Sequence, residues 1–121
     1  MENLSALLEE LSAREPLFHR RAFWSDRASL EAMTAPDFWE VGASGRVYER
    51  DFVIETVLGR ATQGEPQAWP CREFRLRQLG ERTYLLTYLL EEPLRTTRRA
   101  TIWECSEAGW RAVYHQGTLV E

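Results

Sequence analysis

Two residues of this sequence could do acid–base chemistry, Glu40 and His115, and both lie in segments with the pattern of β-strands. Burial of a carboxyl group beside an aromatic ring, here Trp39, raises its pKa toward the range that enzymes use. An imidazole titrates near neutral pH and can act as a general base or hydrogen-bond a ligand. Glu40 and His115 are therefore the candidate catalytic residues.

Each candidate also has a purely structural interpretation. Glu40 could form an ion pair with Arg46 or Arg99, because structural ion pairs also perturb titration. His115 could be a core histidine whose hydrogen bond comes from Thr101 across a strand pair. The residue types alone leave both interpretations open.

Other kinds of chemistry lack a pattern in the sequence. No serine or cysteine is spaced to form a nucleophilic pair with His115, and His19 is the only other histidine. The two cysteines, Cys71 and Cys105, form no C-x-x-C or metal-binding spacing, so we expect reduced thiols. The sequence thus predicts no metal and no cofactor.

Length and charge narrow the class of protein. A chain of 121 residues is large enough for one core, so we expect a single domain over residues 1–121. Its net charge of −4, without a basic stripe, argues against nucleic-acid binding. The densest positive stretch, Arg95, Arg98 and Arg99, is expected to be a solvated strand end.

No segment is typical of export or membrane insertion. The acidic, amphipathic start "MENLSALLEE" differs from a signal peptide. The apolar run "YLLTYLL" is far too short to cross a bilayer and indicates a buried strand. We expect a cytoplasmic protein without a membrane partner.

The first half of the chain has helical spacing. One helical face carries four leucines, Leu4, Leu7, Leu8 and Leu11, and Asn3 or Ser5 is the expected cap of this helix. A short helical piece with Pro16 in its first turn is expected through Arg21 to Trp24, and "RASLEAM" is a further helix capped by Ser25 or Asp26. After a strand over 38–43, a short strand and a helix follow in "RVYERDFVIETVLGR", and Gly59 or Gly64 ends that helix.

Residues 62–70 have the composition of a loop. After it, the pattern of apolar and polar residues predicts four strands, over 71–79, 82–92, 97–105 and 110–117. Helices followed by a strand meander indicate an α+β fold, with N-terminal helices packed on a curved antiparallel sheet.

The last hairpin fixes which side chains share a face. With Gly109 closing a three-residue turn, Thr101 lies opposite His115, and Arg99 lies opposite Gly117. One face then carries Arg99, Thr101, Trp103, Val113 and His115, and the other carries Ala100, Ile102, Trp110, Ala112, Tyr114 and Gln116. Because both faces hold apolar residues, we expect both to be covered, one by helices and one by a second copy.

Two segments resemble a known family. They are "PDFWEVGASGRVYER", with Asp37, Glu40 and Gly45, and "RRATIWECSEAGWRAVYHQGT", with the ending His115 to Thr118. Together they resemble the nuclear transport factor 2-like superfamily (SnoaL-like, cystatin-like fold), and more narrowly the domain of unknown function 4440 family of small bacterial proteins. The resemblance covers nearly the whole chain.

The resemblance implies a cone, in which helices close over a strongly bent antiparallel sheet around an internal pocket, and dimers that form through the sheet. The superfamily contains isomerases, dehydratases and hydrolases as well as non-catalytic binders and assembly hubs. Isomerase-like members carry a catalytic aspartate on the strand after the first helices, and Glu40 is the nearest acid here.

These observations predict a homodimeric domain that binds a small organic ligand through Trp39, Glu40, Arg99, Thr101, Trp103 and His115. Two alternatives remain. One is an acid–base enzyme of the isomerase, dehydratase or hydrolase type that uses Glu40 and His115, and the other is a non-catalytic assembly module. The sequence leaves open whether a reaction is catalysed.

Overall fold

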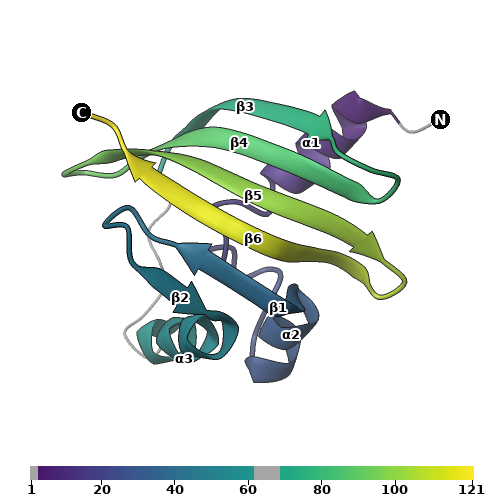
Figure 1. Ribbon diagram of the computed structural model, residues 1–121, viewed down its shortest axis with the longest axis horizontal. Helices are drawn as coiled ribbons and strands as arrows, with labels where there is room; N and C mark the ends of the chain where they lie inside the picture. The colour runs from purple at the N-terminus through teal and green to yellow at the C-terminus, as the bar shows by residue number, and fades with distance from the viewer. Residues whose placement is uncertain (1–2, 62–68) are drawn as a thin grey trace.

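The computed structural model describes residues 3–61 and 69–121, which form helices around a curled, unclosed six-stranded sheet (Figure 1). The elements in chain order are α1 (Leu4–Ser12), α2 (Arg27–Ala32), β1 (Thr34–Val41), β2 (Val47–Glu49), α3 (Arg50–Ala61), β3 (Cys71–Gln78), β4 (Thr83–Glu91), β5 (Thr96–Ser106) and β6 (Gly109–Leu119). The sheet order is β2-β1-β6-β5-β4-β3. The predicted α+β class and curved sheet are confirmed.

The sheet is mixed, so the prediction of a purely antiparallel sheet was wrong at one pair. β1 pairs with β6 in parallel, and every other neighbouring pair is antiparallel. A hairpin cannot join parallel strands, and here the chain between β1 and β6 supplies the crossover. The ladder is irregular between Thr34 and Trp39, where Pro36 has no N–H to donate.

The helix ends follow local chemistry. The side chain of Asn3 accepts a hydrogen bond from the backbone N–H of Ser5 at 2.9 Å, so Asn3 is the cap of α1. Asp26 and Ser29 form a reciprocal capping box at the start of α2. α3 continues through Gly59 to Ala61, so Gly59 does not end it, and Gly64 with residues 62–68 lies outside the described residues.

The helical piece expected through Arg21 to Trp24 does not form. Phe18 has a φ of 71°, outside the right-handed helical region, and the segment before α2 consists of turns. The indole N–H of Trp24 donates to the carbonyl of Phe18 at 3.0 Å, which folds this segment back on itself. That buried hydrogen bond takes the place of a helical one.

The β5–β6 register matches the prediction near His115 and departs from it near the turn. Thr101 pairs with His115 and Arg99 pairs with Gly117. Ser106 pairs with Gly109 across a two-residue turn, one residue shorter than expected, and a bulge after Ile102 absorbs the difference. Trp103 therefore pairs with Ala112 rather than Val113.

The bulge changes the inner face of the sheet. Ala112 is fully buried, and Trp110 packs edge-on against Tyr84 with ring centroids 5.6 Å apart, so both join the core. Val113 is only half-buried. The core fills the concave side between the sheet and the helices, and its fully buried members include Leu11, Leu30, Ile54, Leu86 and Trp103.

In the part of the chain that the structure describes, no helix is both long and apolar enough to cross a membrane.

Candidate functional site

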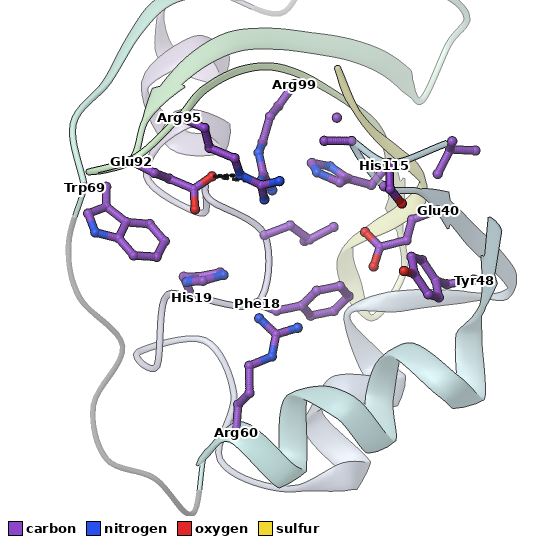
Figure 2. A pocket seen from close by; sticks show the side chains of 16 residues that line it. Phe18, His19, Glu40, Tyr48, Arg60, Trp69, Glu92, Arg95, Arg99 and His115 are labelled. Atoms are coloured by element: carbon purple, nitrogen blue, oxygen red, sulfur yellow. Dashed lines mark hydrogen bonds and ion pairs between the residues drawn. The ribbon is translucent and has the colours of Figure 1, made fainter. Parts of the chain in front are cut away.

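A cavity of about 310 Å³ lies on the concave side of the sheet, between the strands and the segments after α1 and at the end of α3 (Figure 2). Its polar lining comes from elements far apart in the sequence. The side chains labelled around it are Phe18, His19, Glu40, Tyr48, Arg60, Trp69, Glu92, Arg95, Arg99 and His115.

The structure brings the two candidate catalytic residues together. Glu40 on β1 and His115 on β6 are register partners in neighbouring parallel strands, whose spacing is about 4.8 Å. Both side chains line the cavity, and Figure 2 shows them on the same wall. Glu40 is half-buried and His115 is only 2% exposed.

His115 has a hydrogen-bond partner for one ring nitrogen, and within the described residues none for the other. Its Nδ1 lies 2.7 Å from the Thr101 hydroxyl oxygen, as expected from the register. Its Nε2 is buried and has no hydrogen-bond partner among the described residues. Burial, with the positive charge of Arg99, lowers the pKa of His115 to about 3, so the ring is neutral at physiological pH.

A buried carboxyl group that sequence reasoning missed lies behind Thr101. Glu15 is fully buried, with the Tyr88 hydroxyl donating to Oε1 at 2.7 Å and the Trp103 indole N–H donating to Oε2 at 3.2 Å. Burial raises the pKa of Glu15, while hydrogen bonds from Thr101, Tyr88 and Trp103 act in the opposite direction. No local pattern marks Glu15, because its partners are 73 and 88 residues away.

Thr101 lies between Glu15 and His115. Its hydroxyl oxygen is 2.7 Å from the His115 Nδ1, and the same hydroxyl acts to lower the pKa of Glu15. A neutral imidazole carries one donor and one acceptor nitrogen, so His115 can hydrogen-bond a partner as well as Thr101.

Glu40 has none of the ion pairs considered from the sequence. Among residues 3–61 and 69–121, no arginine nitrogen lies within 4.0 Å of its carboxylate. Burial raises the pKa of Glu40, while the charges of Arg99 and Arg60 lower it from a longer range. The carboxyl group thus has the property expected of an acid–base group in a cavity.

Arginines contribute more to this cavity than the sequence suggested. Arg95 and Arg99 line the cavity and share the Glu92 carboxylate, at 3.1 Å and 3.6 Å respectively, while Arg98 is exposed outside it. Arg95 and Arg98 are exposed, as expected of a solvated strand end, and the half-buried Arg99 is not. Arg60, from the last turn of α3, faces the cavity from the opposite side (Figure 2).

His19 and Trp69 close a further side of the cavity. Their ring centroids are 5.7 Å apart, and the His19 Nδ1 has no partner in the described part of the chain. Burial and the charges of Arg60 and Arg99 lower the pKa of His19 to about 4. No role for His19 could be assigned from the sequence, because no local pattern connects it with Trp69 or with the strands of the cavity.

The remaining predicted ligand-binding residues do not reach the cavity. Trp39 is 41% exposed on the outer face, where its ring packs against Tyr114 at 5.1 Å. Thr101 and Trp103 are fully buried and do not line the cavity; Thr101 contacts the lining residue His115, and Trp103 contacts Glu15. Of the six, the structure places Glu40, Arg99 and His115 at the cavity.

The pKa of His115 predicts how stability depends on pH. As pH falls below about 6.5, the unfolded chain binds a proton at this histidine, but the folded chain does so only near pH 3. The free energy of unfolding should therefore decrease with falling pH. Between about pH 7 and pH 5, wild type should lose about 2 kcal/mol more than His115→Gln in urea unfolding. Carboxyl groups titrate in both proteins, so the difference isolates His115, and parallel pH curves would contradict its neutral state.

Known structures share this architecture, although no model of a protein family and no curated protein matches the chain. An NTF2-like protein from Cytophaga hutchinsonii is 15% identical with a TM-score of 0.73, over 99% of this chain and 100% of that one. A candidate dehydratase of the NTF2-like family from Streptomyces avermitilis is 14% identical with a TM-score of 0.73, over 98% of this chain and 99% of that one. An uncharacterised protein with a cystatin-like fold from Caulobacter vibrioides is 14% identical with a TM-score of 0.67, over 100% of this chain and 92% of that one. The chain has the curled α+β fold of the NTF2-like proteins.

Proposed function

We propose that the chain binds a small organic molecule in the cavity beside Glu40 and His115. The carrying observation is His115, which lines this cavity and whose buried Nε2 has no hydrogen-bond partner in the described residues. Leaving such an atom unsatisfied costs free energy, so a buried orphan in a cavity favours a ligand that satisfies it. A volume of about 310 Å³ is at the small end for ligand sites.

The narrower assignment, to the domain of unknown function 4440 family, is part of this proposal. It rests on the segment from Asp37 to Gly45 and on the ending His115 to Thr118. In the structure the first segment carries Glu40 to the cavity and the second carries His115 and Gly117. The two motifs that define the resemblance are thus the two strands that meet at the site.

A second candidate function is acid–base catalysis at the same site. It is favoured by Glu40, a cavity carboxyl group with a raised pKa and no ion pair in the described residues, next to the free Nε2 of His115. A carboxylate of this kind can remove a proton from a bound ligand. The similar fold of the candidate dehydratase is compatible with this chemistry, but a shared fold does not determine a reaction.

The outer face of the sheet supports a homodimer. Trp39, Tyr114, Ile102 and Leu85 are successive register partners across β1, β6, β5 and β4, and Trp39 is 41% exposed. Such a continuous apolar row is typical of an interface, because it would otherwise face water. A second copy is the simplest occupant, since one self-complementary face closes a two-fold dimer.

Filling the cavity should abolish binding. A Cβ at Gly117 would sit 3.9 Å from Arg99 Nε, in ordinary contact, so Gly117→Leu places its side chain in the cavity without a backbone clash. The matched control is Thr118→Leu, one residue along β6 and exposed. In a thermal-shift screen of small aromatic and aliphatic metabolites, hits should raise the melting temperature of wild type and Thr118→Leu but not Gly117→Leu. Hits that stabilise all three equally would refute this site.

If the site is catalytic, Glu40 should exchange a ligand proton with solvent. For any hit with an acidic C–H, deuterium uptake from heavy water, followed by NMR, should slow by about 10²- to 10⁴-fold in Glu40→Gln while binding is kept. Glu49→Gln, exposed on β2, is the control. Equal exchange rates in wild type and Glu40→Gln would exclude Glu40 as the base.

A charge on the outer face should dissociate the dimer. Ile102→Arg places an unpaired cation in the centre of the apolar row, which is costly to bury. Sedimentation equilibrium should give a dimer for wild type and a monomer for Ile102→Arg. Leu94→Arg, at a position that is 99% exposed, should stay dimeric. A monomeric wild type would remove the dimer from the proposal.

A further inference from the structure

We infer that the ligand is an organic acid, whose carboxylate or phosphate group binds between the guanidinium groups of Arg60 and Arg99. This inference rests on the proposed function, because it specifies the ligand of the same cavity. Its basis is the charge of the lining, the incomplete pairing of the arginines and the position of the acceptor atoms.

The cavity has the opposite charge balance to the whole chain. Three guanidinium groups line it, from Arg60, Arg95 and Arg99, against two carboxylates, from Glu40 and Glu92. The chain as a whole carries a net charge of −4. Walls of low dielectric concentrate such a local excess of positive charge and attract an anion.

Two of these arginines are not fully neutralised by the protein. Arg99 lies 3.6 Å from a Glu92 carboxylate that Arg95 approaches more closely, at 3.1 Å. Arg60 has no carboxylate within 4.0 Å in residues 3–61 and 69–121. Planar guanidinium groups hold carboxylates and phosphates through paired hydrogen bonds, so both arginines have donors to offer.

Other groups in the cavity respond to this positive field. Burial is the main cause that lowers the pKa of His19 and His115, and the charges of Arg60 and Arg99 at His19, and of Arg99 at His115, lower it further. Both rings are therefore neutral, so the positive field comes from the arginines alone. Those arginines also keep the nearby Glu40 closer to its ionised form than burial would allow.

The acceptor atoms define the other end of the ligand. Figure 2 shows Arg99 and Arg60 on opposite sides of the cavity, with Glu40 and His115 together on a third side. The Glu40 carboxylate accepts hydrogen bonds and the His115 imidazole can accept or donate one, so this side suits a hydroxyl or amino group. Figure 2 shows Phe18 between Arg60 and Glu40, Tyr48 beside Glu40, and Trp69 beside His19, so these rings supply apolar contact along the cavity wall. A single-ring hydroxy or amino acid fits both the volume and this polarity.

The first test compares acids with their neutral isosteres. Calorimetric titration at low salt with benzoate, phenyl phosphate and benzamide should show binding of at least one acid, with benzamide about 10- to 100-fold weaker or undetectable. The two acids distinguish a carboxylate ligand from a phosphate ligand. A hydroxyl group, as in 3-hydroxybenzoate, should strengthen binding of the preferred acid. Equal binding of benzamide and benzoate would overturn the inference.

The second test removes the charge on one side. Arg60→Gln keeps a polar side chain and should weaken the binding of the preferred acid about 10-fold or more, with unchanged weak binding of benzamide. Arg98→Gln, exposed on β5 outside the cavity, should bind like wild type. Circular dichroism of both variants checks that they fold.

The outcomes separate this inference from the proposed function. If neutral rings bind, Gly117→Leu blocks them, and acids show no advantage, the cavity binds ligands but the acid assignment is wrong. If acids bind equally to Arg60→Gln and wild type, the role of Arg60 is overturned. If neither acids nor neutral rings bind, both the inference and the proposed function fail.

Discussion

The buried carboxyl group of Glu15 is the contact on which the site depends. It ties the segment after α1 to the centre of the sheet, through the Tyr88 hydroxyl on β4 and the Trp103 indole on β5. A buried carboxyl group without partners would strongly destabilise the fold, but here both oxygens accept hydrogen bonds. The contact fixes the start of the 16–26 turns, and these turns place Phe18 and His19 in the cavity wall opposite the strands. One interaction therefore holds the two sides of the cavity at a set distance.

The same carboxyl group is linked to the cavity through Thr101. The Thr101 hydroxyl acts to lower the pKa of Glu15, and its oxygen lies 2.7 Å from the His115 Nδ1. His115 in turn pairs with Glu40 across β6 and β1, and both residues line the cavity. A row of side chains across the sheet thus connects the buried carboxyl group with the residues of the cavity wall.

Local patterns in the sequence predict those parts of the fold that local contacts stabilise. The leucine spacing of α1, the cap at Asp26 and the pairing of Thr101 with His115 each depend on neighbours a few residues away or on one tight turn. The parallel pairing of β1 with β6 and the role of Glu15 depend on contacts across most of the chain, which no local periodicity encodes. The register error at Trp103 has a different cause: a turn one residue shorter, corrected by a bulge, exchanged Val113 for Ala112 on the inner face. The prediction also placed both Trp39 and Glu40 at the ligand. Neighbouring side chains of a strand point to opposite faces, so Trp39 lies on the outer face because Glu40 points into the cavity.

The cavity also explains why its residues look unremarkable in composition. Arg60, Arg95 and Arg99 are ordinary surface residue types in an acidic chain, and Arg95 is exposed. They form a positively charged lining only because the end of α3 and the start of β5 bring them around one cavity. Glu92 bridges two of them, Arg95 and Arg99, and one carboxylate cancels only one of their two positive charges. Full pairing by protein carboxylates would have stabilised the empty cavity and closed it to anions. Because the pairing is incomplete, a bound acid can supply this stabilisation instead. The same guanidinium groups can therefore stabilise the empty fold or bind a ligand, but not both fully.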